Sequence, residues 1–158
     1  IMVRDGNFDT ASTAEPFIEV FSAGNSGASG LTAPKEGKNL IVTASSDNFR
    51  VGSIDNISGF SSRGPAVDGR WVPTISAPGA QIASTRNDDG GSCGTAIAGT
   101  NNLYSFCSGT SMAAPHTSGV IVLVTEWWRG FAEGGADPSP AMAKALLVNG
   151  AVDMGTAD

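Results

Sequence analysis

Residues 108–116 read SGTSMAAPH and contain the side chain best suited to covalent chemistry. Ser111 follows a Gly-Thr pair and directly precedes a long apolar run, so we expect it in the first turn of a helix. There the free backbone N–H groups and the helix dipole stabilise a neighbouring anion. An acyl-transfer enzyme needs this geometry, because the serine oxygen attacks a carbonyl and a nearby N–H group receives the oxyanion. The pattern predicts a nucleophile at Ser111.

A second polar residue stands at the end of an expected strand. Residues 17–23 form a strand-like apolar stretch, which runs into the turn sequence GNSG. Asn25 is therefore expected at the carboxyl end of a strand, the edge of an α/β sheet where ligands bind. Its side-chain amide could donate a hydrogen bond to an oxyanion. A structural role stays open for both residues, because serine often caps helices and asparagine often occupies turns.

The elements that must position these residues follow from hydrophobic periodicity and turn residues. The helix after Thr110 or Ser111 should reach Arg129 and, being apolar on nearly all sides, should pass through the core. A second helix is expected from Ser139 to Val148, with Pro140 at its first position. Further expected elements are strands at 40–44, 75–77 and 81–84, short β pieces near Ile54 and Phe60, and a loop or hairpin at 85–107 with its turn at 87–91. These elements predict a parallel α/β domain.

Composition excludes several classes of protein. The 158 residues are 41% hydrophobic and 15% charged, which indicates one folded domain. The net charge of −6 without a basic stripe argues against nucleic-acid binding, and no apolar run is long enough for a membrane span. Cys93 and Cys107 lie in a loop rich in Gly and Asn, where a disulfide is predicted over two unpaired thiols. A disulfide suits an oxidising compartment, so we expect a secreted or extracellular protein.

The two candidate segments, together with FSSRGP at 60–65 and ISAPG at 75–79, resemble the subtilisin-like serine proteases (subtilases, peptidase family S8) over residues 17–154. The resemblance implies a three-layer αβα fold with a mainly parallel sheet. It implies that Ser111 is the nucleophile and that the Asn25 side chain and the Ser111 backbone N–H form the oxyanion hole. It also makes Ser22, Ala23 and Gly24 a wall of the pocket for the substrate side chain before the scissile bond. Because these residues are small and include no acid, we expect a broad apolar preference.

The chain holds one histidine, His116, which the motif itself contains. Five positions along a helix turn the side chain about 140° away from Ser111, so His116 should not act as its base. We expect it to be buried beneath the site. In subtilisins the aspartate and the histidine precede the serine, which would place both upstream of Ile1. Residues 1–158 are then expected to be the C-terminal part of a catalytic domain. No lysine is expected to replace the base. Lys35 and Lys38 fall in a loop after Asn25, where solvation is the ordinary expectation, and Lys144 falls on the last helix, where nothing places it near Ser111.

The resemblance also implies partners. A polypeptide substrate is expected, with either a complementary N-terminal fragment carrying the aspartate and histidine or self-association, and the isolated chain should be inactive. No cofactor and no metal ligands are predicted; subtilases frequently hold structural calcium, but no ligand spacing for it is legible here. One alternative is a non-catalytic, subtilase-like binding or interaction module. A serine esterase is the other, although Gly-x-Ser-x-Ala differs from the Gly-x-Ser-x-Gly elbow of α/β-hydrolases.

Overall fold

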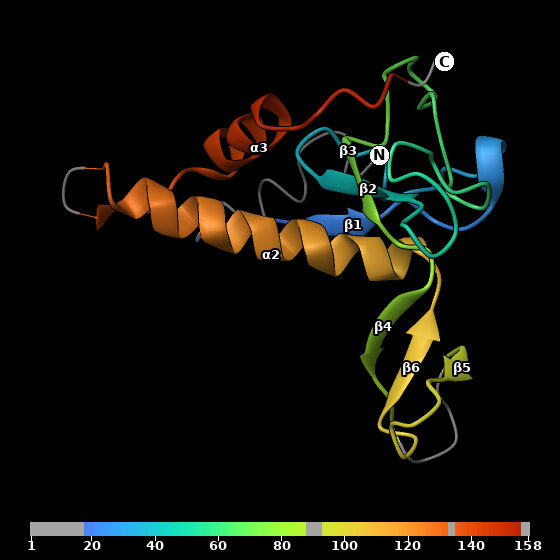
Figure 1. Ribbon diagram of the computed structural model, residues 1–158. Coiled ribbons are helices and arrows are strands. Elements are labelled where there is room, and N and C mark those ends of the chain that lie inside the picture. Colours follow the sequence, from blue (N-terminus) through green and yellow to red (C-terminus); the bar gives the residue numbers. More distant parts are fainter. Residues whose placement is uncertain (1–17, 88–92, 133–134, 156–158) are drawn as a thin grey trace.

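A three-stranded parallel sheet forms the centre of the computed structural model, which describes residues 18–87, 93–132 and 135–155. Strands β1 (Val20–Ser22), β2 (Ile41–Ser46) and β3 (Ile75–Pro78) lie in the order β1-β2-β3 (Figure 1). Every residue of β2 is buried, as a central parallel strand requires. A short 3₁₀ helix, η1 (Gly27–Ser29), follows β1. The strands predicted at 17–23, 40–44 and 75–77 are confirmed, although the first is shorter than expected.

Helices α2 (Thr110–Arg129) and α3 (Pro140–Asn149) pack against one face of this sheet. Ile41 of β2 forms a buried cluster there with Ile121 and Leu147 of the two helices. Side chains from loops close the other face around Leu40 and Val42; they are Leu31, Ala66 and Val72. The predicted α/β class is confirmed, and the described helices cover one face while loops cover the other.

A second, antiparallel sheet projects beyond the N-terminal end of α2 (Figure 1). Strands β4 (Ile82–Thr85), β6 (Tyr104–Cys107) and β5 (Thr95–Ala96) lie in the order β4-β6-β5. We call residues 82–107 the ribbon. Its predicted turn at 87–91 falls, apart from Asn87, outside the described residues. The ribbon leads directly into the segment that carries Ser111.

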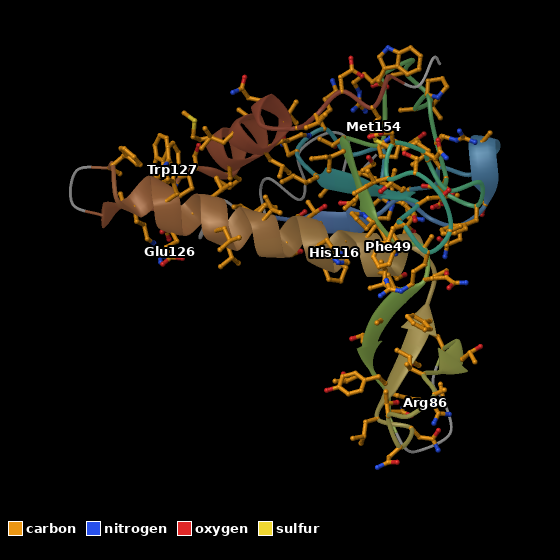
Figure 2. All side chains as sticks on the ribbon, in the orientation of Figure 1. Phe49, Arg86, His116, Glu126, Trp127 and Met154 are labelled. Atoms are coloured by element: carbon orange, nitrogen blue, oxygen red, sulfur yellow. A yellow bond between two sulfur atoms is a disulfide. The ribbon has the colours of Figure 1, made fainter. Side chains whose placement is uncertain are left out.

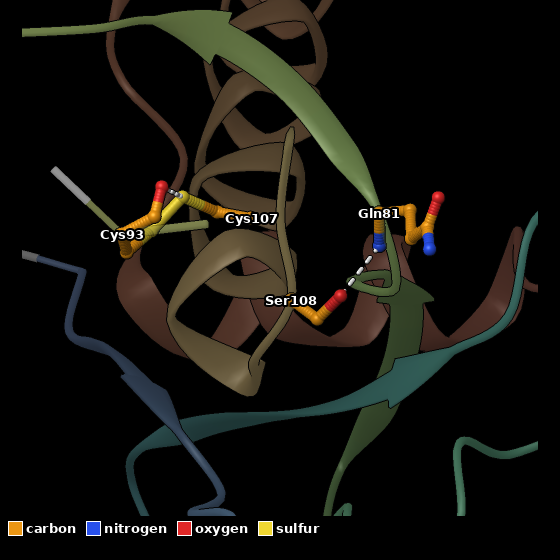
Figure 3. The surroundings of a disulfide bond; sticks show 4 residues. All are labelled: Gln81, Cys93, Cys107 and Ser108. Carbon is orange, nitrogen blue, oxygen red and sulfur yellow. Dashed lines mark hydrogen bonds between the residues drawn. A yellow bond between two sulfur atoms is a disulfide. The ribbon is translucent and has the colours of Figure 1, made fainter. Parts of the chain in front are cut away.

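The predicted disulfide is confirmed: Cys93 and Cys107 are bonded, with their Cα atoms 5.7 Å apart (Figure 3). Replacing both by Ser should lower the free energy of unfolding by about 3 kcal/mol, because the bridge restricts a short loop in the unfolded chain. Urea unfolding of the double variant measures this loss, with the reduced unaltered protein as the matched control. An unchanged free energy of unfolding would contradict a stabilising role.

The expectation that α2 passes through the core was wrong. Its buried residues lie on one side only, whereas Val122, Leu123 and Trp127 are 65%, 64% and 53% exposed. The physical reason is that the sheet contacts one side of the helix and no described segment covers the other. Figure 2 shows Trp127 and Glu126 near the far end of this helix.

Two further expectations concern local structure. No strand forms near Ile54 or Phe60 among the described residues; Ile57 makes a single bridge to Ser46, and the Asn56 N–H closes a turn on the Ser53 carbonyl. The expected start of α3 is confirmed, because the Ser139 hydroxyl accepts a hydrogen bond from the Met142 N–H at 3.2 Å. None of the described helices is long and apolar enough to cross a membrane.

Candidate active site

Ser111 lies in the first turn of α2 with its side chain exposed. It borders an open cleft of about 510 Å³ between β1 and the first turns of the helix. The other residues that line this cleft are Val20, Phe21, Ser22, Ala114, Pro115 and Ser118. The serine hydroxyl is thus accessible from solvent and stands on a helix that the sheet holds in place.

The side chain of Asn25 is oriented by Thr110, the residue before the serine. The Thr110 N–H and hydroxyl donate to the Asn25 Oδ1 at 2.9 Å and 3.0 Å. A backbone N–H can only donate, so the atom facing it must be the oxygen. The Asn25 Nδ2 is left without an acceptor among the described residues. A Cβ on Gly109 would lie 3.4 Å from this Nδ2, which places the amide group beside the start of α2.

The FSSRGP segment, residues 60–65, holds the loop around Asn25 through hydrogen bonds of Ser62. The Ser62 N–H donates to the Gly24 carbonyl at 2.8 Å, and the Ser62 hydroxyl accepts from the Ser26 N–H at 3.0 Å. Gly24 has φ of 111°, and a Cβ there would lie 2.9 Å from the Ser62 Oγ. Only glycine suits this position. Bonds on both sides therefore fix the backbone of Asn25.

The ISAPG segment holds the loop before Ser111 in the same way. The Gly109 N–H donates to the Gly79 carbonyl at 2.8 Å, and a Cβ on Gly79 would lie 2.7 Å from the Gly109 carbonyl oxygen. The Ser108 hydroxyl accepts from the Gln81 N–H at 2.8 Å, close to the disulfide (Figure 3). A nucleophile needs such a rigid support, because small displacements cost rate.

Comparison with known proteins decides the family. The sequence profile of the subtilase family matches residues 4–158. The chain belongs to the subtilase family. It is 35% identical to serine protease AprX of Bacillus subtilis (strain 168) over 136 residues, covering 82% of this chain and 29% of AprX. It is 34% identical over 112 residues to thermitase of Thermoactinomyces vulgaris, covering 71% of this chain and 32% of thermitase.

Solved structures agree with this assignment. A crystal structure of a cold adapted subtilisin-like serine proteinase superposes with a TM-score of 0.62 at 25% sequence identity. The superposition covers 91% of this subtilase chain and 42% of the proteinase chain. The chain therefore spans about a third of the length of AprX or thermitase and less than half of the solved structure.

His116 of this subtilase is exposed, so the expectation that it is buried under the site was wrong. Figure 2 shows His116 on α2. Its Nδ1 lies 2.8 Å from the Met112 carbonyl oxygen, one turn earlier on the same helix. No described segment packs over this side of α2, which is why the ring faces solvent.

Lys144 lies at the opposite end of the sheet from Ser111. Its Nζ donates to the carbonyls of Lys38 and Leu40, at 2.9 Å and 2.7 Å, just ahead of β2. Burial lowers the pKa of Lys144, and the nearby charge of Arg70 lowers it further. Because Asn25 follows the carboxyl end of β1, a parallel neighbour of β2, this amine is remote from the site.

The three residues predicted to form a pocket wall, Ser22, Ala23 and Gly24, do not share one environment. Ser22 lines the cleft beside Ser111, whereas the Ala23 side chain is fully buried in the core with Leu40 and Val42. Only the backbone of Ala23 can therefore border a substrate. Lys35, expected in solvent, is half-buried, and its Nζ lies beside Gly24. Among the described residues, no group of three or more His, Cys, Asp or Glu could hold a metal ion.

Sequence reasoning missed Thr110 and Ser62 as residues that support the site. Both are buried and act through hydrogen bonds to residues 36 to 86 positions away along the chain. The sequence offered one signal for each supporting role. Thr110 is adjacent to Ser111, and Ser62 belongs to the FSSRGP motif. Neither signal specifies which atoms meet.

Proposed function

We propose that the protein is a serine endopeptidase that cleaves peptide bonds through an acyl-enzyme on Ser111. The observation that carries this is the amide of Asn25: Thr110 binds its oxygen, so its Nδ2 is left to donate beside the first turn of α2. The Ser111 Oγ attacks the carbonyl carbon, and its proton passes through a base to the leaving amine. The Asn25 Nδ2 and the Ser111 N–H stabilise the oxyanion. Water then hydrolyses the ester and restores the serine.

The base and its orienting aspartate come from outside this chain in our proposal. His116 is the only histidine of the sequence and bonds along its own helix. A complementary segment carrying the histidine and the aspartate, or a second polypeptide supplying them, would complete the triad. Without them only a residual acceleration of about 10³–10⁴ over water is expected. The disulfide suits secretion into an oxidising compartment.

A second candidate function is a non-catalytic interaction module. The exposed apolar residues on α2, Val122, Leu123 and Trp127, favour it, because large apolar patches often mark contact surfaces. The Asn25 Nδ2, which has no acceptor within the described part of the chain, favours the peptidase instead, since a pure binding module has no need of an aimed oxyanion donor.

Peptide hydrolysis separates the two functions. The assay compares this chain alone with the complemented protein, by which we mean the chain together with a subtilase segment that carries the histidine and the aspartate. We expect background rates from the chain alone and turnover from the complemented protein, lost when Ser111→Ala is introduced. Ordinary protease rates from the chain alone would contradict the need for a second segment. A complemented protein without turnover would favour the interaction module.

Thr110 should act as a positioning residue. Replacing it by Val keeps its shape but removes the hydroxyl that accepts from the Gly24 N–H and donates to the Asn25 Oδ1. We expect kcat of the complemented protein to fall about tenfold with KM little changed, the effect of about one lost hydrogen bond. Thr110→Ser keeps the hydroxyl and should retain most of the rate. Equal losses in both variants would contradict the role of the hydroxyl.

A further inference from the structure

Asn48 is a buried polar residue outside the candidate site, two positions after the end of β2, and is 7% exposed. Its Oδ1 accepts from the Arg50 N–H at 2.9 Å, and its Nδ2 donates to the Ala80 carbonyl at 2.6 Å. The first bond is local and is common for asparagine in turns. The second joins residues 32 positions apart, so the side chain connects the end of β2 to the turn between β3 and β4.

The Ala80 carbonyl belongs to the same planar peptide group as the Gln81 N–H. This N–H donates to the Ser108 Oγ at 2.8 Å, as Figure 3 shows. One rigid unit therefore carries two side-chain contacts, with Asn48 on its oxygen and Ser108 on its nitrogen. A rotation of this peptide group would weaken both bonds at once.

The backbone angle next to this peptide group is unfavourable. Gln81 has φ of 50°, in the left-handed region that residues with a Cβ rarely adopt. Such a conformation persists where surrounding contacts hold it. The bonds to Asn48 and Ser108 are contacts of this kind, because they fix the peptide group on which the angle depends.

The turn at residues 79–81 supports the loop that leads into α2. Gly79 accepts from the Gly109 N–H at 2.8 Å, so the turn holds two consecutive residues of this loop, 108 and 109. Thr110 follows, and its N–H donates to the Asn25 Oδ1 at 2.9 Å. A shift of the loop would displace the candidate nucleophile relative to the candidate oxyanion donor, and such small displacements cost rate.

We propose that Asn48 is a positioning residue for Ser111, acting through the Ala80–Gln81 peptide group on Ser108. The inference rests on the proposed peptidase function and adds a residue on which that function depends. Asn48 lies outside the sequence segments that carry the subtilase resemblance. Its side chain bonds to Arg50 and Ala80, so its effect on the reaction is indirect.

A double-variant cycle in the complemented protein tests this path. Asn48→Ala and Ser108→Ala should each lower kcat about tenfold with KM little changed, the effect of about one lost hydrogen bond. Because both residues act through one peptide group, the double variant should also lose about tenfold. A loss of about a hundredfold, the product of two independent effects, would overturn the proposal. An unchanged kcat in Asn48→Ala would overturn it as well.

Thr74→Val is the matched control for a loss of stability. The Thr74 hydroxyl accepts from the Val42 N–H at 3.2 Å, so this variant also removes a partly buried hydrogen bond, but at the other end of β3. Urea unfolding should show that both Thr74→Val and Asn48→Ala lose stability, whereas kcat of Thr74→Val should stay within about twofold. A tenfold loss of kcat in this control would assign the effect of Asn48→Ala to stability and overturn its positioning role.

Amide hydrogen exchange, followed by NMR on this chain alone, needs no turnover. Asn48→Ala should speed exchange at the Gln81 and Gly109 amides and leave the amides of β2 unchanged, because only the turn and the loop lose their support. Unchanged exchange at Gln81 and Gly109 would overturn the proposal. Absence of hydrolysis by the otherwise unaltered complemented protein would overturn the peptidase function instead.

Discussion

Replacing Asn25 by Asp should lower kcat of the complemented protein by about 10²–10³, a magnitude measured for the oxyanion donor of a subtilisin and not obtained from this structure. The carboxylate can still accept from the Thr110 N–H and hydroxyl, so the loop should keep its conformation. What disappears is the donor Nδ2, and a negative charge takes its place beside the oxyanion. Steady-state kinetics should show the loss in kcat with little change in KM.

The same chemical change on the ribbon provides the control for Asn25. Asn101 is exposed, neither lines the cleft beside Ser111 nor bonds to Asn25, and Asn101→Asp should therefore leave kcat within about twofold, as expected for a surface change. A loss of less than threefold in Asn25→Asp, with the loop intact, would show that the Asn25 amide does not stabilise the transition state.

Replacing Ser111 by Ala should have the largest effect of all. Loss of the attacking oxygen is expected to reduce kcat by about 10⁶, again a magnitude known from a subtilisin. The exposed position of Ser111 and the contacts that hold its loop do not depend on its hydroxyl, so folding should be preserved. Urea unfolding measures the stability of the Ser111→Ala variant, and peptide hydrolysis measures its kcat.

Ser53 serves as the matched control for Ser111. It is exposed on a loop, where its hydroxyl contacts Asp55, and lies outside the candidate site. Ser53→Ala should retain the activity of the unaltered protein. Substantial hydrolysis by the Ser111→Ala variant, measured beside this control, would assign the reaction to another group.

Local sequence signals predicted the elements of the fold well. Helix α2 begins and ends where the Gly-Thr pair and Gly130 indicate, and Ser139 and Pro140 mark the start of α3. The buried strand β2 followed from its small and apolar residues. Such signals depend on neighbours within a few positions, which the sequence displays directly.

Exposure could not be predicted in the same way. The apolar sequence of α2 indicated a buried helix, yet Leu123 and His116 face solvent. An apolar helix is buried only where other segments pack over it, and the described chain supplies such segments on one side. Local periodicity carries no information about which segments these are.

In the candidate site too, local features could be predicted from the sequence and long-range contacts could not. Motifs predicted Ser111 and Asn25 as candidates, and the structure places Asn25 beside the start of α2, bonded to the residue before Ser111. The three bonds of Thr110 and the position of Lys35 beside Gly24 could not be predicted. They arise from contacts between side chains and distant backbone, for which sequence spacing gives no rule.

Covalent labelling of the complemented protein tests the role of Ser111 most directly. A fluorophosphonate reacts with an activated serine, and mass mapping of the digested protein then locates the adduct. We expect one adduct, on the peptide that contains Ser111, and none in the Ser111→Ala variant. An adduct on another residue, or an unlabelled Ser111 in a protein that hydrolyses peptides, would contradict its assignment as the nucleophile.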